Sequence, residues 1–192
     1  MKKIVVGLLS LGSLLCMPGA ALAERADALQ PIKVLAESGE AGDIDQSGVA
    51  EGNVVLTRGT LIIKSGKMKL DQDKDGYYTV VLTAAPGALV TFRQKRDGND
   101  LWAEGEAERI VYTDRDDIMK LTGRAKVTSL DGAKIDNQIK GQFVSYDSRK
   151  GAIKAINASE GPAKSNGQLI EMIFDRSKRT APAATPAPAA KP

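Results

Sequence analysis

Histidine is absent from this chain of 192 residues, and cysteine occurs once. Without histidine the chain has no Ser-His-Asp triad, no imidazole general base and no histidine-containing zinc site. Aromatic residues are scarce too, with one tryptophan, four tyrosines and three phenylalanines. The formal net charge is only +3, and basic residues alternate with acidic ones instead of clustering. A nucleic-acid binder gathers its basic residues on one face, so the charge pattern argues against nucleic acid as a partner.

The one cysteine lies in an N-terminal segment typical of a secretory signal peptide. Two lysines precede an apolar run at 4–15, and a small-x-small motif ends at Ala23. An apolar run of this length is too short to span a bilayer. We interpret residues 1–23 as a signal peptide and expect a mature periplasmic chain that begins at Glu24 and has neither cysteine nor histidine. Acylation of Cys16 is the alternative, but that processing requires a small preceding residue, and a leucine stands there.

The C-terminal residues 176–192 differ in composition from the rest of the chain. A short basic segment is followed by alanine and proline, without a large apolar side chain. Such a segment buries nothing that would offset the entropy lost on ordering. We therefore expect a flexible, polyproline-like tail whose basic residues are solvated rather than bound to an anionic lipid or partner. One folded domain, at 24–175, remains between the terminal segments.

Alternating apolar and polar residues indicate β-strands throughout this domain. In the window 119–128 every second residue is apolar or glycine, so the apolar groups share one face of a strand. Shorter windows of the same period surround Val54, Met68 and Val90. Turn-forming pairs separate such windows, at Asp75-Gly76, Pro86-Gly87, Asp97-Gly98 and Asp131-Gly132. The pattern predicts an all-β sandwich, barrel or coiled stack, with at most a short helix near 36–41.

Two segments begin with the same spacing of glycine, apolar residue and threonine. They read Gly52-Asn53-Val54-x-Leu56-Thr57 and Gly123-Arg124-Ala125-x-Val127-Thr128. Because glycines at 66, 105 and 141 recur at intervals of roughly 36 residues, we interpret the chain as a stack of strand units of about that length. A stack has two open ends with unpaired backbone groups, and the sequence offers no evident cap for them.

Acidic residues form two patterns that resemble functional sites. Asp71-x-Asp73-x-Asp75-Gly76 matches the opening of a calcium-binding EF-hand loop, but Leu82 stands where the bidentate glutamate is required, so a solvated acidic turn is favoured. Carboxylate groups for polysaccharide cleavage would come from Asp116 and Asp117, or from Glu104, Glu106 and Glu108. Nothing distinguishes these residues from solubilising charges on exposed strand ends. We therefore expect no enzymatic activity, no metal and no cofactor.

Several short motifs occur in an order and spacing typical of one known family. They are Gln30-Pro31-Ile32-x-Val34, Gly52-Asn53-Val54, Val90-Thr91-Phe92, Ala103-x-Gly105-x-Ala107, Leu121-Thr122-Gly123, and Ile139-x-Gly141 followed by Tyr146-Asp147. On these residues, the segment of about 28–174 resembles the OstA-like family. Two features depart from the family pattern at expected surface bends: Arg124, where asparagine is usual, and Lys134-Ile135-Asp136, which lengthens the following turn.

The resemblance implies a fold and a binding site. The fold would be an open, twisted β-jellyroll built from repeated antiparallel strands, and its interior groove would hold the acyl chains of lipopolysaccharide. By the family pattern, the groove contacts are Ile32, Val34, Phe92 and Tyr112. Alternation alone adds Leu121, Val127 and Phe143. Plain core packing is the alternative for each residue, because groove lining and core share one face of the sheet.

The resemblance also implies a function. The protein would bind lipopolysaccharide and join end to end with further copies of itself, as a bridge from an LptC-like inner-membrane protein to an LptD-like outer-membrane protein. The strand pattern supports this independently, since an aliphatic inner face can solvate hydrocarbon at roughly 0.8 kcal/mol per buried methylene. The alternative is a structural or adhesive β-stack that binds envelope polysaccharide or protein without a lipid groove.

Overall fold

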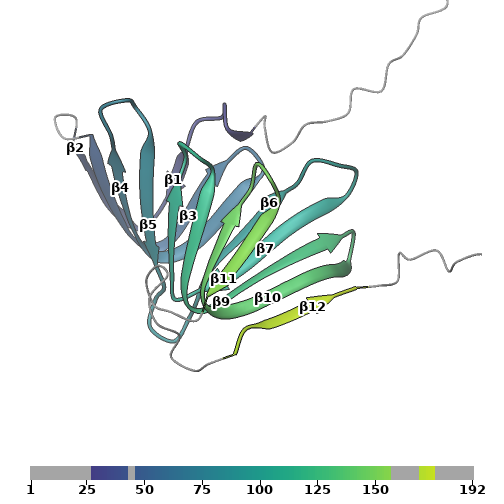
Figure 1. Cartoon of the computed structure of the whole chain (residues 1–192). Helices are drawn as coiled ribbons and strands as arrows, with labels where there is room; N and C mark the ends of the chain where they lie inside the picture. Colours follow the sequence, from purple (N-terminus) through teal and green to yellow (C-terminus); the bar gives the residue numbers. More distant parts are fainter. Residues whose placement is uncertain (1–26, 43–45, 157–168, 176–192) are drawn as a thin grey trace, which may run out of the picture.

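The computed structural model describes residues 27–42, 46–156 and 169–175, and most of them form β-strands (Figure 1). The predicted all-β architecture is therefore confirmed. None of the described segments is a helix of the length and apolar character that crossing a membrane requires. The predicted signal peptide at 1–23 and the predicted tail at 176–192 lie outside the described residues.

Twelve strands form one antiparallel sheet. In chain order they are β1 (Lys33–Leu35), β2 (Ser38–Gly42), β3 (Ser47–Arg58), β4 (Leu61–Gln72), β5 (Tyr78–Thr83), β6 (Val90–Lys95), β7 (Leu101–Ala107), β8 (Arg109–Thr113), β9 (Ile118–Asp131), β10 (Lys134–Asp147), β11 (Ala152–Ile156) and β12 (Glu171–Phe174). Each of the four long strands, β3, β4, β9 and β10, pairs with two short strands along different parts of its length.

The twelve strands are two copies of a six-stranded unit, β1–β6 and β7–β12. In each unit the first two strands pair with the long third strand, the third pairs with the long fourth, and the last two strands pair with the fourth. Gly52 and Gly123 differ by 71 in residue number, as do Ser38 and Arg109. The predicted unit of about 36 residues is thus wrong, because Gly105 lies on the first strand of its unit and is not equivalent to Gly66 on a fourth strand.

A bulge bends the long strands at the same place in each unit. Gly52 and Asn53 have φ angles of 80° and 45°, and Gly123 and Arg124 have 77° and 48°. In each unit these two residues lie opposite a single residue of the neighbouring long strand, where the pairing register shifts. Such bulges bend and twist a strand. The sheet consequently folds into a V, with β2 and β5 on one side and β6, β7 and β12 on the other (Figure 1).

The V has two layers. We call β2, β5, β8 and β11, with the adjoining parts of the long strands, the first layer, and β1, β6, β7 and β12, with the remaining parts, the second layer. Val54, Leu121 and Val127 are fully buried on the face between the layers, as their alternation predicts. The rings of Phe92 on β6 and Tyr146 on β10 stack at a centroid distance of 5.8 Å. This contact joins the two layers.

Turns and edges agree with the sequence in part. The four predicted turn glycines, Gly76, Gly87, Gly98 and Gly132, all have positive φ angles between strands. The segment 36–41, where the sequence left room for a short helix, instead includes most of β2, which pairs with β3 from Ser38 to Gly42. The side chains of β2 are exposed, so backbone pairing rather than a buried face holds this strand in place.

Candidate functional site

The predicted groove residues fall on both faces of the sheet. Phe92 and Tyr112 are 3% and 2% exposed, Leu121 and Val127 are fully buried, and Ile32 and Val34 are partly buried against the same core. Phe143 instead alternates with buried Val144 and Tyr146, so it lies on the outer face. The register shift between Gly141 and Phe143 inverts the alternation along β10. The structure therefore brings six of the seven residues to the interior and places Phe143 outside.

A glycine shapes the interior beside Phe92. Gly105 on β7 pairs directly with Phe92 on β6. A Cβ atom at Gly105 would lie 2.9 Å from the carbonyl oxygen of Lys126 and 3.0 Å from Cδ1 of Phe92. The missing side chain allows the aromatic ring to lie against the neighbouring strand. Phe92 thereby contacts β7 within its own layer and Tyr146 in the other layer.

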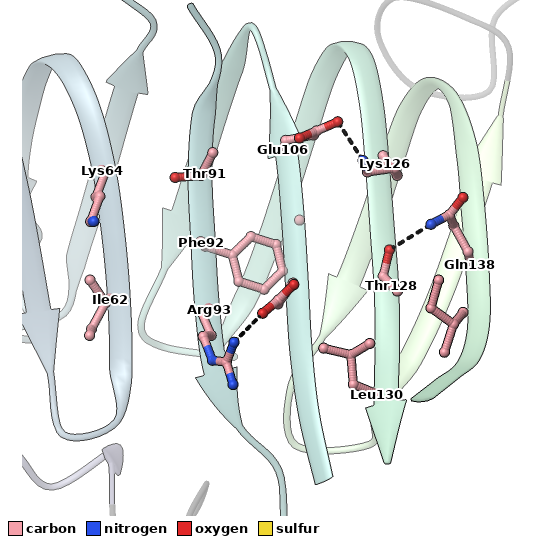
Figure 2. A pocket seen from close by; sticks show the side chains of 13 residues that line it. Ile62, Lys64, Thr91, Phe92, Arg93, Glu106, Lys126, Thr128, Leu130 and Gln138 are labelled. Atoms are coloured by element: carbon pink, nitrogen blue, oxygen red, sulfur yellow. Dashed lines mark hydrogen bonds and ion pairs between the residues drawn. The ribbon is translucent and has the colours of Figure 1, made fainter. Parts of the chain in front are cut away.

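The outer face of the second layer carries a depression of about 480 Å³, shown in Figure 2. Its lining comes from β4, β6, β7, β9 and β10: Ile62, Lys64, Thr91, Phe92, Arg93, Glu104, Gly105, Glu106, Lys126, Thr128, Leu130, Ile135 and Gln138. Ion pairs cross it between Arg93 and Glu104 and between Lys126 and Glu106. The exposed side chains of Ile62 and Ile135 lie beside these ion pairs, so the depression combines charged groups with apolar surface.

A buried polar cluster joins the two layers at the open side of the V. Arg58, at the end of β3 in the second layer, is 7% exposed. Its Nη1 donates to the hydroxyl of Tyr112 at 2.6 Å and to Oδ1 of Asp117 at 3.4 Å, and it lies 3.8 Å from Oδ2 of Asp114. The Tyr112 hydroxyl in turn donates to Asp117 at 3.0 Å. We call Arg58, Tyr112, Asp114 and Asp117 the latch cluster.

The surroundings of the latch cluster shift two pKa values. Burial, together with the nearby Asp117 charge, raises the pKa of Tyr112 far above its usual value. Loss of hydration also raises the pKa of Asp114, although the amide of Tyr78 and the charge of Arg58 oppose the change. Both effects follow from placing ionisable groups where water is excluded.

Asp117 corrects a prediction from the sequence. We expected an exposed, solubilising carboxylate, but Asp117 is 7% exposed and has a positive φ of 50°. Besides Tyr112 and Arg58, Arg149 contacts it through Nε at 2.7 Å. A contact between Arg58 and a residue so distant in sequence leaves no local pattern, so the sequence carried no signal for this cluster.

The Asp-rich turn between β4 and β5 is held by its own backbone amides and by Arg115 from the β8–β9 turn. The side chain of Asp73 accepts hydrogen bonds from the amides of Asp75 and Tyr77, and Arg115 pairs with both Asp73 and Asp75. The turn carboxylates are therefore neutralised by protein groups. Across the described residues, no group of three or more acidic side chains has the geometry of a metal site.

Residues 33–152 match the family described as LptA/(LptD N-terminal domain) LPS transport protein. The chain belongs to this family. The match spans β1 to the first residue of β11, which is most of both six-stranded units.

Individual members of the LPS transport family resemble the chain over most of its length. The lipopolysaccharide export system protein LptA of Haemophilus influenzae is 28% identical over 156 residues, covering 81% of this chain and 87% of that protein. LptH of Pseudomonas aeruginosa is 27% identical and covers 83% and 87%. The crystal structure of LptH, the LptA homologous periplasmic component of the conserved lipopolysaccharide transport device from Pseudomonas aeruginosa, has a TM-score of 0.67 at 26% identity and covers 78% of this chain and 99% of that structure.

Both ends of this LPS transport family member present strands with one neighbour. Among the described residues, β1 and β2 pair only with β3, and β11 and β12 pair only with β10. Met172 and Phe174 on β12 are 50% and 63% exposed. Large apolar groups at a sheet edge with unpaired backbone groups favour the addition of another strand.

Proposed function

We propose that this protein carries lipopolysaccharide across the periplasm, from the inner to the outer membrane, as a segment of a protein bridge. The observation that carries the proposal is the family match over residues 33–152, on a two-layered sheet with an apolar interior. The resemblance to named lipopolysaccharide export proteins favours this function over that of a structural or adhesive stack.

The interior between the two layers is the proposed site for the acyl chains. Six residues are assigned to it: Ile32, Val34, Phe92, Tyr112, Leu121 and Val127. Each methylene removed from water there gains roughly 0.8 kcal/mol. Most of this gain is offset, because the acyl chains leave another apolar environment, the membrane. The interior therefore binds lipid without driving its movement.

Photocrosslinking tests this site with a matched pair of positions. A crosslinking residue at Phe92 points between the layers, whereas one at the neighbouring Thr91 points to the exposed outer face. We expect lipopolysaccharide adducts from position 92 and few from position 91 in intact cells. Equal yields from both positions, or no adduct from any interior position, would contradict the proposal.

The junction between the two units supports end-to-end assembly. Within the chain, β5 pairs with β8, and β6 pairs with β7. At the free ends, β11 and β12 are the equivalents of β5 and β6, while β2 and β1 are the equivalents of β8 and β7. A second copy added in the same way places its β2 beside β11 and its β1 beside β12.

The internal pairings also define the register of that contact. Val81 pairs with Val111 inside the chain, and their counterparts at the ends are Lys154 and Glu40. The pairing of Phe92 with Gly105 similarly sets Met172 opposite Val34. Opposite charges and apolar groups therefore meet at equivalent positions, as expected for favourable cross-strand pairs.

The same two edges are the proposed contacts with the membrane partners. An LptC-like inner-membrane protein and an LptD-like outer-membrane protein would each add strands at one end of the assembly. Because the β1–β2 edge and the β11–β12 edge differ in sequence, crosslinkers at Glu40 and at Lys154 are expected to capture different partners. Capture of the same membrane protein from both positions would contradict this assignment.

A further inference from the structure

We propose that the latch cluster controls access to the apolar interior by holding the open side of the V closed. The proposal rests on the proposed lipid site, because it concerns how an acyl chain reaches that site. It assigns a positioning role to Arg58, Asp114, Asp117 and the hydroxyl of Tyr112, whereas the ring of Tyr112 remains one of the interior contacts. The bends at Gly52 and Gly123 join the layers on one side, and the latch cluster joins them on the other.

The contacts of the latch cluster cross from one layer to the other. Arg58 belongs to the end of β3 in the second layer, whereas Asp114 and Asp117 belong to the β8–β9 turn of the first layer. The bonds from Arg58 to Tyr112 and Asp117 are therefore links between layers. All four side chains are buried, so removing one partner leaves another polar group without water or a replacement bond.

The N-terminal segment makes further contacts at the same place, on the outside of the latch cluster. Arg58 donates through Nε to the carbonyl oxygen of Gln30 at 3.2 Å and through Nη2 to that of Ala28. The carboxylate of Asp27 accepts from the amide of Thr60 at 2.7 Å and from its hydroxyl at 2.5 Å. Figure 1 shows the start of the described chain lying above the strands at this side of the V. One arginine thus binds both the opposite layer and the segment that covers it.

The closed interior makes an opening step necessary. Leu121, Val127 and Val144 are fully buried, and Phe92 stacks on Tyr146 between the layers. Several long acyl chains therefore displace these contacts when they enter. The long strands run through the bends and pair with each other on both sides of each bulge, whereas the open side is held by side chains, so separation is cheapest at the latch cluster. Weakening it raises the population of the open state and, in proportion, the rate at which the interior becomes accessible.

Thiol labelling measures this opening without any lipid. In the mature chain, which the sequence predicts to lack cysteine, Val144→Cys places one thiol in the closed interior. Tyr112→Phe in this background removes the hydroxyl that links Arg58 to Asp117 and keeps the ring. We expect labelling by a maleimide in the absence of denaturant to become about fivefold faster, the effect of losing one buried hydrogen bond. The rate should change little at low urea concentrations, because local opening exposes less surface than unfolding.

A variant with a similar loss of stability outside the interior is the control. Gly87→Ala forces an alanine to adopt φ 77° in the β5–β6 turn, where its Cβ would have no neighbour within 4 Å, so the latch cluster and the contacts between the layers stay intact. We expect its urea-independent labelling rate to match that of the Val144→Cys parent. If Gly87→Ala accelerates labelling as much as Tyr112→Phe, or if neither variant does so, the latch assignment is overturned.

Lipopolysaccharide binding then separates the two proposals. With purified lipopolysaccharide as the probe, Tyr112→Phe should raise the association rate by the same factor as the labelling rate. If labelling accelerates but no variant, the parent included, binds lipopolysaccharide, the latch assignment stands and the proposed function fails. If binding is normal and labelling is unchanged by Tyr112→Phe, the proposed function stands and the latch assignment fails.

Discussion

Two aspartates in neighbouring turns show how position decides the pKa of a carboxyl group. Asp73 is exposed, and its hydrogen bond from Arg115, aided by those from the amides of Tyr77 and Asp75, lowers its pKa below 3.8. Asp114 is largely removed from water, and its pKa is raised. Asp73 therefore stabilises the fold above its unfolded pKa, and this contribution is lost as pH falls through its folded pKa. The contribution of Asp114 to the free energy of unfolding has the opposite pH dependence. Because the folded state holds the proton of Asp114 more tightly, this contribution falls as pH rises.

Arg115→Gln tests the first of these effects. The substitution removes the principal hydrogen bond to Asp73, so we expect the pKa of Asp73 to rise toward 3.8. An NMR titration of side-chain carboxyl carbons measures the change. Arg93→Gln, which removes an exposed ion pair with Glu104 elsewhere, is the control and should leave Asp73 unchanged. An unaltered Asp73 titration in Arg115→Gln would show that the turn amides alone set its pKa.

Sequence reasoning at the scale of single residues found apolar positions better than polar ones. Leu121 and Val127 follow a period of two, which a reader of the sequence can count. Arg58 and Asp117 have no such signature, because a buried charge is defined by partners that the chain brings together only on folding. Polar clusters of this kind are therefore visible only in the structure.

The bulges in the long strands decide which of their side chains reach the interior. At each bulge, two residues of the third strand lie opposite one residue of the fourth strand. Along the third strand, the alternation of buried and exposed side chains on either side of Gly123 stays in phase, whereas along the fourth strand it inverts. This is why the window 119–128 was predicted correctly and Phe143 falls on the other face. A prediction from periodicity alone cannot locate such a phase shift before the pairing register is known.

Gly123→Ala tests how much the bulge requires glycine. At φ 77° an alanine is strained, and its Cβ would lie 3.0 Å from Cβ of Glu108. Gly87 also has φ 77°, but a Cβ there would have no neighbour within 4 Å. We expect Gly87→Ala to cost about 1 kcal/mol in the free energy of unfolding from backbone strain alone. Gly123→Ala should cost about 1 to 3 kcal/mol more.

Urea unfolding of the two glycine variants provides the comparison. Because both carry the same backbone strain, the difference between their unfolding free energies isolates the crowding beside Glu108. Equal losses in the two variants would mean that Glu108 moves aside freely and that only the backbone conformation requires glycine.

The internal junction and the two free edges are built from equivalent strands, so the proposed contact between copies repeats the junction inside the chain. The sequence already contained this information in the spacing of its Gly-Asn and Gly-Arg motifs, but the nearby glycines suggested a shorter unit. Only the strand pairings show that six strands repeat. The register between copies follows from those pairings, so it becomes testable at the level of single residues.

A charge reversal tests that register. Lys154→Glu places like charges opposite each other between copies, and we expect the dissociation constant for self-assembly to rise about threefold to tenfold. Adding Glu40→Lys in the same chain should restore assembly. Sedimentation velocity over a concentration series measures both effects. Failure of the second substitution to restore assembly would show that these two residues are not opposite each other.

A further consequence of the repeat concerns direction. A contact between two different edges, β11–β12 on one copy and β2–β1 on the next, does not close on itself as a symmetric dimer does. Copies joined in this way form a directional filament in which every subunit has the same orientation. Its two tips are chemically distinct whatever the number of subunits. In the proposed bridge, the distance between the two membranes would set how many subunits separate the tips, so the filament would need no device to measure its own length.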